Sequence, residues 1–332
     1  MKKAEVIQKI LGDRVLPDDA SGASFAPANI ALCKYWGKRD PEINLPVNGS
    51  LSISLHDKGT QVNITPAEFD GLSINDEMLA ADDPKHVRMF DFIDLFRQDS
   101  APTLHIATQS NIPIAAGLAS SASAFAAVVM ALDRAGGWDL FARQLSILAR
   151  MGSGSACRSI YHGFVEWHPG SQGHGMDCFA ELLPEQWPEF RVGLLALSTA
   201  AKKVGSREGM NRTVRESVLY QSWPAVADQD LGEIRAAIQA RDFPRLGMAA
   251  ESNACSMHAT MLGCRPPLLY WLPETVETLH RVWGLRDEGV SVYATMDAGP
   301  NVKLLFLEEE ASAVQEAFPE MEVTRPFAPL GT

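Results

Sequence analysis

The sequence predicts an α+β fold built from two domains. The chain has 332 residues, more than one domain of typical size. Strand-like and helix-like segments intermingle, but they lack the regular strand–helix alternation that a doubly wound parallel sheet requires. The pattern also changes around Pro184–Pro188, beyond which helical spacing predominates. We therefore expect one domain over residues 1–188 and a second over residues 189–332.

The expected elements of the first domain are short strands and a few helices. Leu51–Leu55 alternates with period two, which is typical of a half-buried strand. Asp139 is placed to cap a helix that runs to about Met151 and carries Phe141 on its apolar face. Further strands are expected over residues 61–65, 71–75, 103–108 and 163–167, and further helices over residues 86–97 and from the loop after Pro113 to about Ala135.

The second domain is expected to be mostly helical between two sets of strands. Arg191–Leu197 is apolar enough for a buried strand. Helical patterns then run from about Ser206 to Val282. Two strands are expected over residues 290–296 and 301–307, followed by a helix over about 309–318 and a last short strand. The helical stretch is interrupted at Pro224, Pro244, Pro266, Pro267 and Pro273.

Charge and cysteine content exclude several classes of protein. The formal net charge of −12 argues against general binding to nucleic acid or to an anionic membrane, since both attract basic surfaces. The uncharged stretch Ser110–Leu132 is long enough to span a bilayer, but Pro113 and Gly117 argue against that interpretation. The five cysteines include no C-x-x-C pair, so neither a disulfide scaffold nor a structural zinc site is expected. A cytoplasmic location is expected.

A loop of small residues at Pro113–Ala122 joins an expected strand to an expected helix. Gly117 allows close approach of a ligand to the backbone, and Ser120 and Ser121 supply hydroxyl groups at the helix start. The free N–H groups and the dipole of a helix N-terminus favour a phosphate there. The two commonest nucleotide fingerprints are absent from the sequence. The alternative is a small-residue turn packed in the core.

Basic residues beside an apolar strand form a second candidate site. Lys34 ends an apolar run, and a buried ammonium is costly unless an anion pairs with it. Lys38 lies four residues further on, with Tyr35 and Trp36 between them. This arrangement suits an anionic ligand, although a solvated strand end with lysine stems over aromatic rings would explain it equally well.

Three further segments carry polar groups suited to binding or catalysis. Ser153, Ser155 and Arg158 follow one another in a glycine–serine loop, and a guanidinium is well shaped for a carboxylate or phosphate. Ser206 and Arg207 end a basic loop, and Asp297 ends an apolar strand in a glycine–proline turn, where a carboxylate could orient or deprotonate a hydroxyl. A flexible turn, a solvated charged face and an ordinary Asp turn are the alternatives. The eight histidines show no metal-ligand spacing and are expected to be structural or superficial.

Together these segments resemble the mevalonate diphosphate decarboxylase family of the GHMP kinase superfamily. The loop is similar to the superfamily's P-x-x-x-G-L-x-S-S-A phosphate loop. The resemblance covers about residues 26–307, and its motifs occur in the family's order. The more specific motifs are Lys34–Asp40, Asn48–Ser52, Gly152–Ser159, Ser252–Asn253 with His258–Thr260, and Asp297–Asn301.

The resemblance implies a GHMP-kinase-type fold with an N-terminal ATP-binding domain and an active site in the interdomain cleft, commonly in a homodimer. The implied reaction is ATP-dependent decarboxylation of mevalonate 5-diphosphate. Phosphorylation of the 3-hydroxyl creates a good leaving group, and loss of phosphate and CO2 then gives isopentenyl diphosphate. ATP and Mg²⁺ are the implied cofactors.

The resemblance also implies roles for individual residues. Asp297 would act on the 3-hydroxyl, Arg158 would hold the substrate carboxylate, and Lys34 would contact the reacting groups. The substrate and its diphosphate would be bound by Tyr35, Lys38, Ser153, Ser155, Ser206 and Arg207. The nucleotide would be bound by Thr108, Gly117, Ser120 and Ser121, with Ser121 also at the Mg²⁺ ion.

Two alternatives stay open at this point. A sibling enzyme could decarboxylate a mevalonate monophosphate or only phosphorylate its 3-hydroxyl, and a non-catalytic sensor could share the fold. Lys34, Arg158 and Asp297 favour decarboxylation, whereas Lys38 and Arg207 favour a diphosphate substrate.

Overall fold

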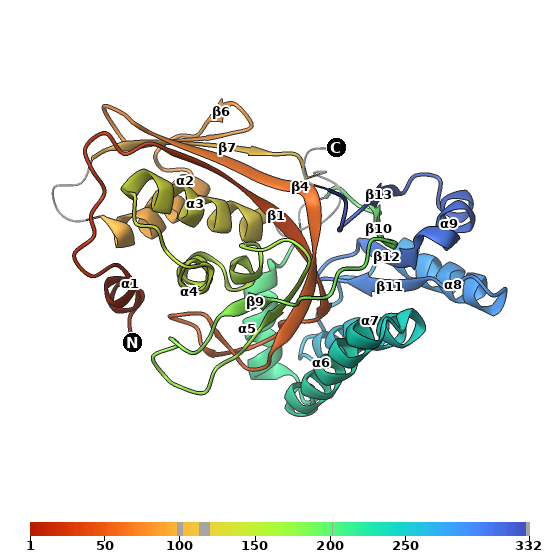
Figure 1. Cartoon of the computed structure of the whole chain (residues 1–332). Helices are drawn as coiled ribbons and strands as arrows, with labels where there is room; N and C mark the ends of the chain where they lie inside the picture. The colour runs from red at the N-terminus through yellow and green to blue at the C-terminus, as the bar shows by residue number, and fades with distance from the viewer. Residues whose placement is uncertain (98–101, 113–119, 201, 330–332) are drawn as a thin grey trace.

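A computed structural model of the chain describes residues 1–97, 102–112, 120–200 and 202–329. Within these residues the strands form a seven-stranded, a four-stranded and a two-stranded sheet. In Figure 1 the long strands β1 and β4 run between helices α2–α4 on one side and the second sheet with its helices on the other. The predicted α+β fold class is confirmed.

The seven-stranded sheet belongs to the first half of the chain. Its order is β6-β5-β7-β4-β8-β9 with β1 paired to β4, and only the β5–β7 pair is parallel among the pairs described. Its strands are β1 (Gly22–Cys33), β4 (Ser50–Pro66), β5 (Gly71–Ile74), β6 (Glu77–Met78), β7 (Leu104–Ser110), β8 (Phe164–Trp167) and β9 (Ala180–Leu182). The helices of this half are α1 (Lys3–Leu11), α2 (Pro84–Ile93), α3 (Ser120–Gly136) and α4 (Ala142–Gly152).

The four-stranded antiparallel sheet belongs to the second half and has the order β11-β12-β10-β13. Its strands are β10 (Phe190–Leu195), β11 (Tyr293–Met296), β12 (Val302–Leu307) and β13 (Glu322–Thr324). The helices of this half are α5 (Ser206–Glu216), α6 (Trp223–Ala240), α7 (Phe243–Leu262), α8 (Pro273–Asp287) and α9 (Ala311–Ala317).

Three of the predicted helix breaks are helix starts. Pro224, Pro244 and Pro273 lie in the first turns of α6, α7 and α8. Proline is well suited to that position because its fixed φ matches the helix and its missing N–H would be unpaired there in any case. The prolines thus set where each helix begins.

The alternating segment Leu51–Leu55 is buried on both faces, so the predicted half-buried strand is wrong. Its Leu and Ile side chains pack into a core shared with the second domain, which includes Phe190 and Leu246. Ser50 and Ser52 point to the opposite face and are also buried. The alternation therefore separates an apolar core face from a buried polar face.

The start of α4 differs from the prediction. Asp139 adopts φ +54° in the turn before the helix and is not its N-cap. Phe141 is the N-cap, its backbone N–H donates to Gln144 Oε1 at 3.0 Å, and its ring is 79% exposed instead of lying on the apolar face. The Gln144 side chain thus satisfies the backbone N–H of the N-cap residue, which is a different donor from the first-turn N–H groups that an Asp139 cap was expected to bind.

The chain passes from the first sheet to the second between Leu182 and Phe190. The predicted boundary at residue 188 lies in this connection and stays a prediction. Within the described ranges, no helix combines the length and apolar character needed to cross a bilayer. The second part of the uncharged stretch forms α3, whose Ala126 and Val128 pack in the core.

Candidate active site

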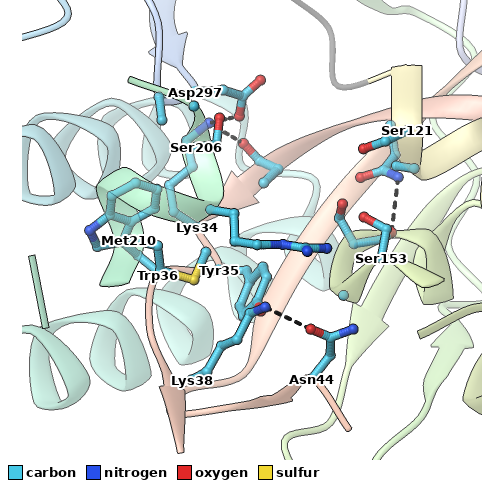
Figure 2. Close-up of a pocket in the computed structure, with 18 of the residues that line it drawn as sticks. Lys34, Tyr35, Trp36, Lys38, Asn44, Ser121, Ser153, Ser206, Met210 and Asp297 are labelled. Carbon is cyan, nitrogen blue, oxygen red and sulfur yellow. Dashed lines mark hydrogen bonds and ion pairs between the residues drawn. The ribbon is translucent and has the colours of Figure 1, made fainter. Parts of the chain in front are cut away.

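A cavity of about 510 Å³ is lined by residues from both halves of the chain. The three predicted catalytic residues, Lys34, Arg158 and Asp297, line it. Ser121 at the start of α3 also faces it. Figure 2 shows Lys34, Ser121 and Asp297 converging from different elements. The six predicted substrate-binding residues line it as well: Tyr35, Lys38, Ser153, Ser155, Ser206 and Arg207.

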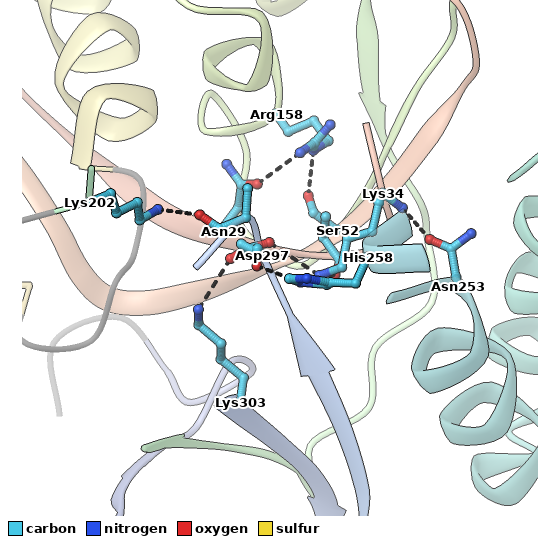
Figure 3. A network of polar contacts seen from close by, with 11 residues as sticks. Asn29, Lys34, Ser52, Arg158, Lys202, Asn253, His258, Asp297 and Lys303 are labelled. Atoms are coloured by element: carbon cyan, nitrogen blue, oxygen red, sulfur yellow. Dashed lines mark hydrogen bonds and ion pairs between the residues drawn. The ribbon is translucent and has the colours of Figure 1, made fainter. Parts of the chain in front are cut away.

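Asp297 lies directly after β11, with one lysine on each carboxylate oxygen. Lys34 Nζ is 3.1 Å from Oδ1 and Lys303 Nζ is 3.3 Å from Oδ2 (Figure 3). Burial opposes ionisation of Asp297, but the two lysines outweigh it and hold the pKa of this carboxyl below its usual range. We call Lys34, Asp297 and Lys303 the Asp297 centre. Its carboxylate is ionised at neutral pH and is 30% exposed toward the cavity.

Lys34 directly follows β1 and is almost completely buried. Its Nζ donates to the Ala31 carbonyl at 2.7 Å as well as to Asp297. Burial lowers the pKa of Lys34, and the nearby Asp297 opposes that shift. The desolvation that the apolar run predicted for Lys34 is therefore partly offset by a carboxylate of the protein itself.

Arg158 ends a short 3₁₀ helix, Gly154–Arg158, and is 2% exposed. Its guanidinium donates from Nε to Ser52 Oγ at 3.1 Å, from NH1 to Ser50 Oγ at 2.5 Å and from NH2 to Asn29 Oδ1 at 3.3 Å. A guanidinium has five N–H donors, so these contacts fix its plane and leave donors for an anion in the cavity. The buried serine face of β4 thus orients the arginine.

Among the described residues, three cations at the cavity are electrostatically coupled to one another and form no ion pair with a carboxylate. Lys38 lies in β2 (Lys38–Asp40), which pairs with β3 (Leu45–Pro46), Arg88 lies in α2, and Arg207 lies in the first turn of α5. None of the three forms an ion pair with a carboxylate of the described part of the chain. We call Lys38, Arg88 and Arg207 the basic cluster.

The basic cluster is held by neutral contacts. Lys38 Nζ donates to Asn44 Oδ1 at 2.6 Å, and Arg88 donates to the Gly152 carbonyl at 3.3 Å. Burial, together with the positive charges of Arg207, Lys3 and Arg88, lowers the pKa of Lys38 to about 8. Uncompensated cations next to a cavity form a site for a polyanion.

The Gly–Ser loop places hydroxyl groups beside an aromatic wall. A Cβ on Gly154 would lie 2.9 Å from Tyr35 Oη, so glycine permits the close approach of the two segments. The Tyr35 ring packs edge-on against Trp167 with centroids 4.8 Å apart. Its buried Oη has no hydrogen-bond partner among the described residues. Ser153 and Ser155 flank Gly154 and face the same space.

Some lining residues were not assigned a role from the sequence. Asn29 lines the cavity and Lys303 pairs with Asp297 behind it, and each interrupts an apolar strand, which is the signal that drew attention to Lys34. Arg88 lies on an amphipathic helix, where an arginine is typical of a solvated face. Lys202, whose Nζ donates to the Ala298 carbonyl at 2.5 Å, belongs to the basic loop before α5. Only the folded chain brings these positions together.

The predicted nucleotide-binding residues are only partly described. Gly117 lies outside the described residues, as does the side chain of Ser120, the first residue of α3. Thr108 lies in β7, donates to the Ser73 carbonyl at 3.1 Å and does not line the cavity. Its role at the nucleotide stays a prediction.

The donor set near Ser121 fits a magnesium ion carried by a nucleotide. Among the described residues no cluster of three or more His, Cys, Asp or Glu side chains could hold a metal. Mg²⁺ keeps several waters and binds substrate phosphates with few protein ligands. A single Ser121 hydroxyl at the cavity is therefore sufficient for such an ion.

Known proteins resemble the chain along most of its length. The family model for the diphosphomevalonate decarboxylase-like N-terminal domain matches residues 26–180, and the model for the mevalonate 5-diphosphate decarboxylase C-terminal domain matches residues 192–325. The chain belongs to the diphosphomevalonate decarboxylase family. The diphosphomevalonate decarboxylase of Danio rerio is 36% identical over 96% of this chain and 82% of its own.

Solved structures of this decarboxylase family share the fold. Mevalonate diphosphate decarboxylase from Staphylococcus aureus superposes with a TM-score of 0.87 at 36% identity, over 93% of this chain and 96% of its own. A complex described as MDDEF with MVAPP, AMPPCP and magnesium gives a TM-score of 0.86 at 37% identity, over 93% and 98% of the two chains. The two-domain GHMP-kinase-type fold implied by the motifs is confirmed.

Proposed function

We propose that this cavity binds mevalonate 5-diphosphate together with ATP and converts them to isopentenyl diphosphate, CO2, ADP and phosphate. The observation that carries the proposal is the arrangement of three anion-directed features around one space. These are the Asp297 carboxylate between two lysines, the oriented Arg158 guanidinium, and the unpaired basic cluster. Family membership supports the same reaction.

Asp297 acts on the 3-hydroxyl of the substrate. Its low pKa makes it a weak base, so it orients the hydroxyl by accepting a hydrogen bond and takes the proton only as the oxygen bonds to the γ-phosphorus. Lys34 stands 3.1 Å from the same carboxylate and stabilises negative charge that develops on the transferred phosphoryl group. Positioning, more than base strength, is what this centre supplies.

Arg158 holds the C1 carboxylate while the 3-phosphate leaves. The C3–O bond pair departs with the phosphate and leaves positive charge at C3. The C1–C2 bond pair then forms the C2–C3 double bond, and C1 is released as CO2. Trp36, Met210 and Met257 line the cavity as apolar surface and reduce the access of water to the cationic carbon.

The basic cluster binds the 5-diphosphate. Lys38, Arg88 and Arg207 supply positive charge, and the hydroxyls of Ser153, Ser155 and Ser206 supply neutral donors. Ser206 also begins α5, where the helix dipole favours an anion. The Tyr35 hydroxyl, which has no partner among the described residues, completes the set.

The nucleotide would be bound at the start of α3 and by the residues that precede it in the sequence. Gly117, Ser120 and Ser121 would hold the ATP phosphates, and Ser121 would also be a ligand of the Mg²⁺ ion. When bound, Mg²⁺ bridges phosphate oxygens and neutralises part of their charge. The division at residue 188, a homodimer and a cytoplasmic location complete the proposal.

The test follows all products with three substrates. Purified enzyme with ATP is given mevalonate, its 5-phosphate or its 5-diphosphate, and ADP, phosphate and CO2 are measured. We expect the three products in equal amounts from the diphosphate and at least about tenfold lower kcat/KM for the monophosphate, because the basic cluster then loses ion pairs. ADP without CO2 would indicate a 3-kinase, and faster turnover of the monophosphate would indicate the sibling decarboxylase.

A further inference from the structure

Helix α7 contributes Met257 to the cavity wall and carries buried polar side chains, three of which bond to other segments of the chain. Glu251, Asn253 and His258 are 6%, 0% and 2% exposed. Each bonds to main-chain atoms of another segment instead of to the cavity. The Ser252–Asn253 and His258–Thr260 motifs fall on this helix, and the proposed reaction gives them no role.

Two of these side chains bond to the backbones of Lys34 and Asp297, the two partners of the central ion pair. Asn253 Oδ1 accepts the Lys34 backbone N–H at 2.7 Å, and Asn253 Nδ2 donates to Asp230 Oδ2 at 2.9 Å. His258 Nε2 lies 3.0 Å from the Asp297 carbonyl oxygen (Figure 3). Lys34 comes from the first domain and Asp297 from the second, so one helix holds both partners by their backbones.

The histidine contact has a defined polarity. A carbonyl oxygen only accepts, so Nε2 must carry the proton. Burial lowers the pKa of His258 to about 4, which keeps the ring neutral near pH 7. Trp271 lies against the ring with centroids 5.1 Å apart. A neutral Nε2–H imidazole is therefore fixed against the turn.

The accepting carbonyl is at the point where the chain turns after β11. Asp297 O also accepts the Gly299 backbone N–H at 2.7 Å, closing a tight turn. Earlier along the chain, within β11, the backbone N–H of Ala294 donates to Glu251 Oε2 at 2.8 Å. The strand is thus anchored to α7 both before and after the carboxylate that faces Lys34 and Lys303.

We propose that His258 is a positioning residue which, by donating from Nε2 to the Asp297 carbonyl, sets the orientation of the Asp297 carboxylate for the phosphoryl-transfer step. The inference rests on the proposed function for the identity of that step. It assigns His258 no contact with substrate. Loss of the His258 contact would change kcat much more than the KM for mevalonate 5-diphosphate, since Lys38 and Arg88 of the basic cluster are held by Asn44 and Gly152 and not by His258.

The test compares His258→Asn with His258→Gln. The glutamine amide nitrogen takes the place of Nε2 and can donate, whereas the shorter asparagine cannot reach the carbonyl. We expect kcat per folded enzyme to fall about ten- to hundredfold in His258→Asn with KM changed less than about threefold, and to return to within about threefold of wild type in His258→Gln. Urea unfolding gives the folded fraction. His280→Asn, which alters an exposed histidine of α8, is the control and is expected to match wild type.

A spectroscopic measurement on the wild-type protein is independent of any variant's folding. Long-range ¹H–¹⁵N spectra of ¹⁵N-histidine-labelled enzyme at pH 7 are expected to show His258 as the neutral Nε2–H tautomer. An Nδ1–H tautomer would overturn the proposal, as would equal impairment of both substitutions or a wild-type kcat in His258→Asn. A wild-type enzyme that releases no CO2 from the diphosphate would instead overturn the proposed function, while leaving the tautomer unchanged.

Discussion

The Asp297 centre and the basic cluster line the same cavity and differ in how their charges are compensated. In the centre, two buried lysines face one carboxylate at 3.1 and 3.3 Å. In the cluster, Lys38, Arg88 and Arg207 have no carboxylate partner within the described residues, and the two arginines are exposed. A compensated centre is preorganised and changes little when substrate arrives. An uncompensated cluster gains most from an incoming anion, so we assign the chemistry to the first and affinity to the second.

The substitution expected to have the largest effect is Asp297→Asn. The amide can still orient a hydroxyl but cannot accept its proton, and it no longer balances Lys34 and Lys303. We expect kcat to fall about 10²- to 10⁴-fold, with ATP binding retained. Steady-state kinetics and nucleotide titration measure the two quantities. Unchanged turnover would remove Asp297 from the mechanism.

Arg158→Lys tests whether the oriented guanidinium matters beyond its charge. Ser50, Ser52 and Asn29 hold the planar group, and a lysine ammonium cannot reproduce that fork. We expect kcat/KM to fall roughly 10²-fold through misplacement of the substrate carboxylate. The ratio of CO2 to ADP formed is the informative readout. A variant as active as wild type would show that charge alone suffices.

Arg207→Met removes one cation of the basic cluster. We expect KM for mevalonate 5-diphosphate to rise about ten- to hundredfold with kcat within about threefold, because a charge-assisted contact to the diphosphate is lost. The matched control is Lys203→Met, which removes a cation from the same basic region without lining the cavity. Equal effects of the two substitutions would mean that general positive potential, and not this site, binds the substrate.

The smallest expected effect is a change in the KM for mevalonate 5-diphosphate with pH. Lys38 has a pKa of about 8 in the free enzyme, so it is charged below that pH and neutral above it. A neutral amine attracts the diphosphate less, and we therefore expect KM to rise about fivefold between pH 7 and pH 9. A Lys38→Arg variant stays charged and should lose this rise. A rise that persists in Lys38→Arg belongs to another group.

Local patterns predicted most elements, and the reasons for the failures are physical. Prolines and apolar runs mark α6–α8 and β10 because both act within a few residues. The sequence could not show that the serine face of β4 is buried, because an alternation of polar and apolar residues is the same whether the polar face meets solvent or protein. Asp139 is not the cap because it lies in a turn with φ +54° and the helix begins only after Phe141.

The site was predictable where residues cluster in the sequence. Lys34 with Lys38, and Ser153 with Arg158, stand in compact motifs, and these motifs carried the family resemblance. Arg88 and the His258 contact were not predictable, because a helix's amphipathic pattern does not reveal which segment will pack against it. Lys303 could have been noticed as the one charge in an apolar strand.

The central claim is that the Asp297 centre carries out the chemistry and the basic cluster supplies the affinity. It is tested most directly by calorimetric titration of mevalonate 5-diphosphate, without ATP, into wild-type enzyme, Asp297→Asn and Arg207→Met. We predict that Asp297→Asn binds within about threefold of wild type while Arg207→Met binds at least about tenfold more weakly. The opposite order, with affinity lost in Asp297→Asn and kept in Arg207→Met, would contradict the account.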